Sequence, residues 1–212
     1  MFNQIHIWVR KKLVPLHILE SLVPKEGTIV DLGCGHGFFA NYLKVHSSAR
    51  RVIGLDLDQQ KICFARLKYK DSGLEFRSFD IRSEALLESV DCITILDVLY
   101  LIPLSEQKII LEQCFNNLRE GGLLICKEVD TRPRWKFTLC FLEECFAVKI
   151  FRITKGADLF FQPSKRLIEC LEQIGFEVSF RSLGKGYFHP HALFLGKKPN
   201  KKGKGPLNAS PL

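Results

Sequence analysis

The stretch VDLGCGHG, Val30–Gly37, decides the fold of this 212-residue chain, because it joins an apolar strand to a helix through three glycines. The run TIVDLG at 28–33 predicts a buried strand, and the residues at 38–45 predict the helix that follows. Glycine lets the backbone turn sharply and approach a ligand without a Cβ clash, and a helix N-terminus offers oriented N–H groups. We therefore expect a nucleotide-type ligand at the carboxyl end of this strand.

Strand-like and helix-like runs alternate after that turn. The alternation predicts a parallel sheet with helices on both faces. Asp58 and Ser105 are expected to cap two of the helices, and Gly121 with Gly122 to end the second of these. Strands are predicted at 28–33, 51–57, 74–80, 91–97 and 123–130, and helices at 38–45, 59–69 and 105–120, with a short one near Ser83.

The regular pattern breaks at Thr131. Residues 131–162 are too long for an ordinary connection. A helix at 164–174 then precedes strands at 176–183 and 191–197, and two successive strands predict an antiparallel hairpin at the end of the sheet. Within the long segment, a helical stripe is formed by Trp135, Leu139, Leu142 and Phe146.

The two flanks differ from the centre in composition. Residues 1–24 predict amphipathic helices, with Ile5, Trp8, Val9 and Leu13 on one stripe and a second helix at 16–22. The closing segment from Lys197 carries five lysines of a chain whose net charge is +8, and it lacks apolar periodicity. We predict a domain at 25–197 and a basic, disordered tail at 198–212.

Cysteine spacing and hydropathy restrict the class of protein. The eight cysteines form no CxxC pair and mostly lie in apolar segments, which favours reduced core thiols over a disulfide or zinc framework. No apolar run reaches the about 18–20 residues that span a bilayer, and the N-terminus lacks the pattern of a signal peptide. We expect a cytoplasmic protein.

The glycine turn differs from two common nucleotide motifs. A dinucleotide fingerprint needs glycine where Phe38 stands, and the Gly-Lys-Ser/Thr ending of a P-loop is absent. Instead, Asp31 precedes the first glycine, and Asp56 closes the second strand, where a carboxylate can accept both hydroxyls of a ribose.

These residues resemble a known family. VDLGCGHG followed by GLDLD at 54–58 is similar to the first two motifs of class I S-adenosylmethionine (SAM) dependent methyltransferases. Three further segments resemble that family in the expected order: FDI at 79–81, LDVLY at 96–100 and LREGG at 118–122, where Glu120 replaces a proline. The resemblance covers about residues 25–197 and implies a Rossmann-like α/β fold, with a seven-stranded sheet and an antiparallel C-terminal hairpin.

The resemblance implies SAM as cofactor, S-adenosylhomocysteine as product and no metal. Asp31 would orient the methionine amino group, Asp56 would bind the ribose diol, and Asp80 would accept from the adenine amino group. The glycines would admit the cofactor close to the backbone. The expected cofactor-binding residues are Asp31, Gly33, Cys34, Gly35, Gly37, Asp56, Leu57, Asp80, Ile81 and Leu96.

Candidate catalytic residues follow the later strands. Methyl transfer from a sulfonium mainly needs alignment and exclusion of water, and it needs a base only if the acceptor must lose a proton. Tyr100 could contact the acceptor or be a half-buried core residue. His189 and His191 lie in the last turn, which reaches the active-site edge if the sixth strand is parallel; they could act as bases or anchor the loop.

The fifth strand ends in three charged residues. Strand alternation puts Glu128 and Asp130 on one face and Lys127 on the other. One of these carboxylates could face the pocket, or they could simply form salt bridges, and the sequence leaves both alternatives open.

The segment at 131–162 bears on the acceptor. In this family an insertion after the fifth strand commonly forms part of a substrate lid, and an apolar, aromatic lid favours a small-molecule or lipid-like acceptor. Arg132, Arg134 and Lys136 beside Trp135 also suit peripheral contact with an anionic membrane. Packing of the stripe on the sheet is the simpler alternative.

Two other functions stay open. Net basicity and the lysine tail allow an RNA or protein methyltransferase, and a degenerate site allows a SAM-binding protein without turnover. The Asp/Asn-Pro-Pro-Tyr/Phe and Pro-Cys motifs of base methylases are absent after the fourth strand, as is a His-Glu-x-x-His zinc pattern.

Overall fold

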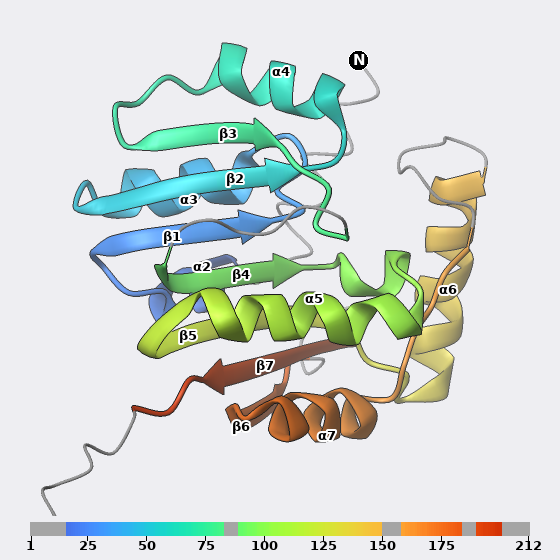
Figure 1. The fold of residues 1–212 in the computed structure, drawn as a ribbon. Helices are drawn as coiled ribbons and strands as arrows, with labels where there is room; N and C mark the ends of the chain where they lie inside the picture. The colour runs from blue at the N-terminus through green and yellow to red at the C-terminus, as the bar shows by residue number, and fades with distance from the viewer. Residues whose placement is uncertain (1–15, 83–88, 150–157, 184–189, 201–212) are drawn as a thin grey trace, which may run out of the picture.

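A computed structural model describes residues 16–82, 89–149, 158–183 and 190–200, and it contains one seven-stranded sheet (Figure 1). The strand order is β3-β2-β1-β4-β5-β7-β6, in which β7 runs antiparallel to both β5 and β6. This confirms the predicted sheet and its terminal hairpin. The strands are β1 Gly27–Leu32, β2 Arg50–Asp56, β3 Leu74–Ser78, β4 Val90–Leu96, β5 Leu118–Val129, β6 Glu177–Ser182 and β7 His191–Lys197.

Helices cover both faces of the sheet. Consecutive residues of a strand point to opposite faces, so Ile29 belongs to a core with α2, α3 and α4, while Val30 belongs to a core with α5 and α7. No helix among the described residues has the length and apolarity that crossing a membrane requires. The helices are α2 Leu16–Leu22, α3 Phe38–His46, α4 Gln59–Lys68, the 3₁₀ turn η1 Leu99–Leu101, α5 Leu104–Asn117, α6 Arg134–Lys149 and α7 Ser164–Ile174.

The junction of α5 and β5 differs from the prediction. The helix ends at Asn117, and β5 runs through both glycines that were expected to end the helix. Two contacts explain the early start of the strand: Leu118 is buried opposite Val90, and the N–H of Gly121 donates to the carbonyl of Lys198 at 2.9 Å.

The two predicted helix caps have different outcomes. The expected cap by Ser105 is wrong, because Pro103 occupies the N-cap position and its carbonyl accepts from Glu106 and Gln107. The cap by Asp58 is confirmed, since its Oδ1 accepts from the N–H of Gln60 at 2.9 Å.

The first residue of the predicted tail, Lys198, is bonded to the sheet and to the end of α5. Lys197 is part of β7, and the Nζ of Lys198 donates to the carbonyls of Phe115 and Leu118 at 2.7 Å each. Residues 198–200 are therefore tied to the domain. The rest of the tail, the helix predicted over Ile5–Leu13 and the short helix near Ser83 lie outside the described residues.

A buried arginine holds α2 on the sheet. The Arg50 side chain at the start of β2 is fully buried, and its guanidinium donates to Glu20 Oε1 at 2.9 Å. It also donates to the carbonyls of Val23, Pro24 and Leu43 at 2.7–2.9 Å. One side chain thus satisfies the end of α2 and the end of α3 together.

We expect Arg50→Met to lower the free energy of unfolding by about 3–5 kcal/mol, because it removes the donor to three backbone carbonyls and leaves Glu20 with Lys25 as its remaining ion-pair partner. The neighbouring Arg51 is 42% exposed and pairs with Glu75 at 3.2 Å, so Arg51→Met is the matched control and should cost less than about 1 kcal/mol. Urea unfolding measures both variants. Equal losses of unfolding free energy in the two variants would show that the buried pair stabilises the protein no more than the exposed pair does.

Candidate active site

The turn after β1 is packed too closely for side chains at two of its glycines. Gly33 and Gly37 have positive φ values of 72° and 76°. A Cβ at Gly33 would lie 2.3 Å from Val98, and one at Gly37 would lie 2.4 Å from Phe76. Because the N–H of Gly33 also donates to the Leu55 carbonyl at 2.7 Å, the turn is held against β2 and β4.

Gly35 differs from its neighbours because it faces open space. It has a φ of 55°, and no atom lies within 4 Å of the place where its Cβ would be. Its N–H donates to Asp56 Oδ2 at 2.7 Å, and Asp56 Oδ1 accepts from the N–H of Asp58 at 2.8 Å. The backbone therefore fixes the Asp56 carboxylate at the carboxyl end of β2, beside the open position.

A cavity of about 160 Å³ opens at this point, at the carboxyl ends of β1, β2 and β4. Its wall is largely apolar, with the carboxylates of Asp56, Asp58, Asp80 and Asp97 spaced around it. Seven of the ten predicted cofactor-binding residues line it: Gly33, Gly35, Asp56, Leu57, Asp80, Ile81 and Leu96. Residues that were not predicted also line the cavity. Most of them lie just after a strand or in the first turn of α4, and this position is the signal that could have found them. They include Leu55, Lys61, Phe79, Arg82, Asp97, Val98, Leu101 and Ile102.

The other three predicted cofactor residues lie behind the cavity. Asp31 is buried, and Thr94 of β4 donates to its Oδ1 at 2.7 Å. Burial raises the pKa of Asp31 to about 7, and the charge of Asp56 acts in the same direction, while the Thr94 bond opposes them. Cys34 packs against the core behind the turn, and Gly37 admits the ring of Phe76.

Asp80 is held by an arginine at the edge of the cavity. Arg82 Nε and Nη2 lie 2.9 Å from Asp80 Oδ1 and Oδ2, and the Arg82 N–H donates to Oδ1 at 3.0 Å. This fork raises the pKa of the Arg82 guanidinium, first through the hydrogen bonds and then through the opposite charge. The three contacts fix the orientation of the Asp80 carboxylate.

A buried ion pair joins the ends of β4 and β5. Asp97 has a positive φ of 58°, and Lys127 Nζ donates to its two carboxylate oxygens at 2.7 and 2.6 Å. The Lys127 side chain is 1% exposed. Strand alternation predicts that Lys127 lies on the face opposite Glu128 but does not identify its partner Asp97, which follows the neighbouring strand β4.

The two remaining charged residues of β5 have different surroundings. Glu128 is buried, and its Oε1 accepts from the N–H groups of Val98 and Leu99 at 3.2 and 3.0 Å, so it holds the turn after β4. Burial, and then the charge of Asp97, raises the pKa of Glu128 to about 8. Asp130 instead lines an open groove with Arg132.

Two of the predicted catalytic residues, Tyr100 and His191, do not line the cavity. Tyr100 is buried in η1 and stacks on Phe161 with ring centroids 4.7 Å apart. His191 is buried at the start of β7, opposite Val129 at the carboxyl end of β5. His189 lies outside the described residues. The catalytic roles of all three stay predictions.

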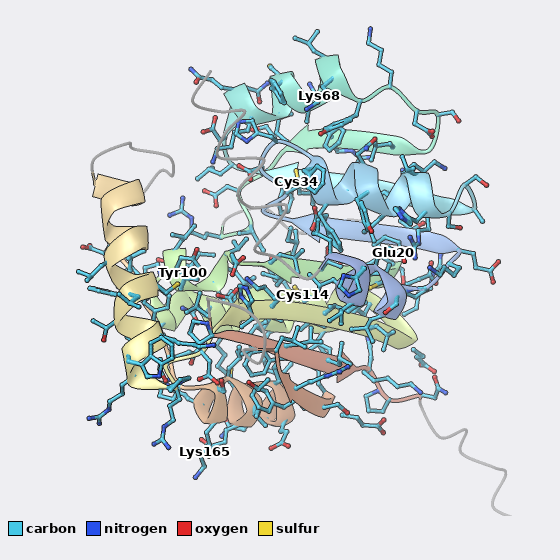
Figure 2. All side chains as sticks on the ribbon, turned by 180° about the vertical axis from the view of Figure 1, so that it is seen from behind. Glu20, Cys34, Lys68, Tyr100, Cys114 and Lys165 are labelled. Carbon is cyan, nitrogen blue, oxygen red and sulfur yellow. The ribbon has the colours of Figure 1, made fainter. Side chains whose placement is uncertain are left out.

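The helix α6 closes this edge of the sheet. Phe137 and Cys140 face inward and pack with Tyr100 and Phe161 in a small aromatic core (Figure 2 shows Tyr100 on the side nearest α6). The described part of the predicted insertion therefore contains a helix that covers the sheet edge beside the cavity. Within the described part of the chain, no group of three or more His, Cys, Asp or Glu side chains is arranged to hold a metal ion.

Comparison with known proteins agrees with this architecture. Residues 29–122 match a family model described as a methyltransferase domain. A ubiquinone biosynthesis O-methyltransferase of Pseudomonas putida (strain W619) is 25% identical over 142 residues, which are 65% of this chain and 59% of that protein. The chain thus spans about three fifths of the length of such curated relatives.

Solved structures share the fold at low identity. The SAM-dependent methyltransferase SibL in its apo form superposes with a TM-score of 0.73 at 16% identity, covering 94% of this chain and 58% of that one. A SAM-dependent methyltransferase from Mesorhizobium loti gives 0.69 at 16% identity, covering 86% and 96%.

We expect Glu128→Gln to stabilise the protein increasingly as pH rises from about 5 to 8. An unfolded glutamate loses its proton near 4.5, whereas folded Glu128 keeps it up to about 8, so the parent loses stability across this window. Glutamine can still accept from Val98 and Leu99 without titrating. Its gain should be on the order of 2 kcal/mol at pH 8.

Urea unfolding at several pH values tests this expectation, with the exposed Glu172→Gln on α7 as control. Parallel stability curves for Glu128→Gln and the parent would contradict the assignment of a raised pKa to Glu128.

Proposed function

We propose that this chain is a class I SAM-dependent methyltransferase and that it transfers the methyl group of SAM to a small-molecule or lipid-like acceptor. The observation that carries the proposal is the gathering of seven predicted cofactor residues around one cavity at the carboxyl edge of the sheet.

The residues of the cavity suit SAM. The open space over Gly35 leaves room for a ligand close to the backbone, as the motif predicts. SAM carries a positive sulfonium and an ammonium group, and several carboxylates surround the cavity. Asp56 would bind the ribose diol, and Asp80 with the N–H of Ile81 would bind adenine. Asp31 would meet the ammonium group through water, since it lies behind the wall.

The chain's own part in the reaction is to position the acceptor and exclude water. SAM supplies an activated methyl group when bound. The Lys127–Asp97 pair and Glu128 hold the turn after β4, which lines the cavity. Aromatic side chains beneath α6 keep the neighbouring edge apolar. Tyr100, His189 and His191 stay proposed acceptor-side residues; burial favours a positioning role for Tyr100 and His191.

The acceptor class rests on α6 and on one comparison. Phe137, Phe141 and Phe161 form an aromatic cluster at the edge where the acceptor would enter, and apolar walls favour apolar ligands. The name of the Pseudomonas putida relative, a ubiquinone biosynthesis O-methyltransferase, supports an acceptor of this kind. A lipid-like acceptor is met at a membrane, so the proposal includes peripheral contact of a cytoplasmic protein with a membrane surface.

We expect Asp56→Asn to weaken SAM binding at least about tenfold, because the amide can no longer accept from two hydroxyls. Asp58→Asn is the matched control: it lies two residues away, lines the same cavity and caps α4, a role that asparagine also fills. Isothermal titration with SAM measures both. An Asp56→Asn affinity within about twofold of the parent would refute the ribose assignment.

The substrate class is tested by transfer of labelled methyl from SAM into a fractionated cell extract, with Asp56→Asn as blank. We expect label in the organic-soluble fraction. Label in RNA or protein would replace this proposal by the macromolecular alternative, and SAM binding without label in any fraction would favour a non-catalytic SAM-binding protein.

Removal of the basic tail distinguishes a small-molecule or lipid-like acceptor from an RNA or protein acceptor. The truncation belongs after Asn200, because Lys198 is bonded to the end of α5 and its loss would disturb the fold. Unchanged activity of this truncated chain supports the small acceptor, and lost activity supports a macromolecular one.

A further inference from the structure

The helix α6 has an apolar face on each side. Its inward face packs through Phe137 and Cys140, as described above. Its outward face carries Trp135, Leu139 and Leu142, which are 61%, 41% and 58% exposed. Their spacing of four and three residues places them on one stripe along the helix. The inward packing of this stripe, the simpler alternative from sequence, is therefore wrong for these three residues, while the side chain of Phe146 lies outside the described residues.

Cations border that stripe. Arg132 and Arg134 are exposed just before and at the start of α6, and Lys136 Nζ lies 5.6 Å from the centroid of the Trp135 ring. The sequence holds no acidic residue from 131 to 142, although Asp130 precedes this stretch and Glu143 and Glu144 follow it. The two arginines line open grooves on either side of Pro133, one of them shared with Phe137 and Pro163. Apolar and positively charged groups thus share one exposed surface.

This surface adjoins the proposed active site. Figure 1 shows α6 on the side toward which the arrowheads of β1–β4 point, outside the turn that follows β4. The cavity opens at the same edge. A partner that contacts the outward face of α6 would therefore lie next to the place where an acceptor enters.

We propose that the outer face of α6, defined as Trp135, Leu139 and Leu142 with Arg132, Arg134 and Lys136, binds the surface of an anionic phospholipid bilayer. This inference rests on the proposed function, because it identifies the membrane as the phase from which the acceptor comes. A helix lying in the interface places leucine and tryptophan at the acyl boundary and its cations among anionic headgroups.

Other occupants fit this surface less well. Three side chains on one helix supply only a small part of the roughly 800 Å² per partner that a stable dimer buries. Nucleic acid would satisfy the cations but would leave the two leucines in water. A bilayer surface matches both components at once.

The test is co-sedimentation of the full chain with vesicles of phosphatidylcholine alone or mixed with phosphatidylglycerol. We expect binding to the anionic vesicles that weakens with added salt. The double variant Leu139→Ser/Leu142→Ser should bind at least about tenfold more weakly, because each leucine contributes apolar transfer energy. Leu67→Ser on α4, where the leucine is 76% exposed, is the control and should bind like the parent.

The charged part of the surface has its own variants. Arg132→Gln/Arg134→Gln/Lys136→Gln should lose at least about tenfold in binding to anionic vesicles. The control is Lys165→Gln/Arg166→Gln on the exposed side of α7, which should change binding little. In a Trp8→Phe background, the fluorescence of Trp135 should shift to the blue with anionic vesicles only.

Three results would overturn the proposal: equal vesicle binding by the leucine variant and the parent, a dimer in sedimentation velocity that the leucine variant abolishes, or saturable binding of RNA that the charge variant abolishes. SAM titration of the same variants distinguishes failure of the membrane-binding proposal from failure of the proposed methyltransferase function. Unchanged SAM affinity with lost vesicle binding supports the surface, whereas a parent that fails to bind SAM refutes the proposed function whatever the vesicles show.

Discussion

The close approach of the turn after β1 to its neighbours is the constraint on which the structure depends. Val98 and Phe76 occupy the space where side chains at Gly33 and Gly37 would lie. The turn can therefore sit directly against β2, β3 and β4, and it leaves its one open position, Gly35, facing the cavity. The same packing that closes the core on one side thus forms the floor of the site on the other.

Charge burial at the carboxyl edge follows from this arrangement. Parallel strands end together, so the polar residues that follow them meet in a small volume. Asp97 is paired with Lys127, Asp56 accepts from two backbone N–H groups, and Glu128 takes a raised pKa. Asp97 and Asp56 are thus stabilised as carboxylates in two different ways, whereas Glu128 keeps its proton to a higher pH and holds the turn after β4 through hydrogen bonds.

The sheet was predictable from sequence because buried parallel strands are continuous apolar runs, and the glycine motif located the cavity. Other features depend on partners distant in the chain. The start of β5 was missed because Gly121 and Gly122 favour a turn locally, whereas Lys198 and Val90 stabilise a strand there. Alternation gave the face of Lys127 but not its partner Asp97. The orientation of α6 was hidden because apolar residues occur on both of its sides, and only Phe161 and Tyr100 decide which side is covered.

The strand order has a consequence for the order of assembly. β6 pairs only with β7, and β7 lies between β6 and β5. During synthesis β6 therefore emerges with no edge to join, and the apolar edge of β5 stays open until residues 191–197 arrive. A nascent chain that stalls before that point exposes an unpaired strand edge, the kind of surface that chaperones bind and that promotes aggregation. Completion of the domain is thus delayed until its last strand, although the cavity is built mostly from the first half of the chain.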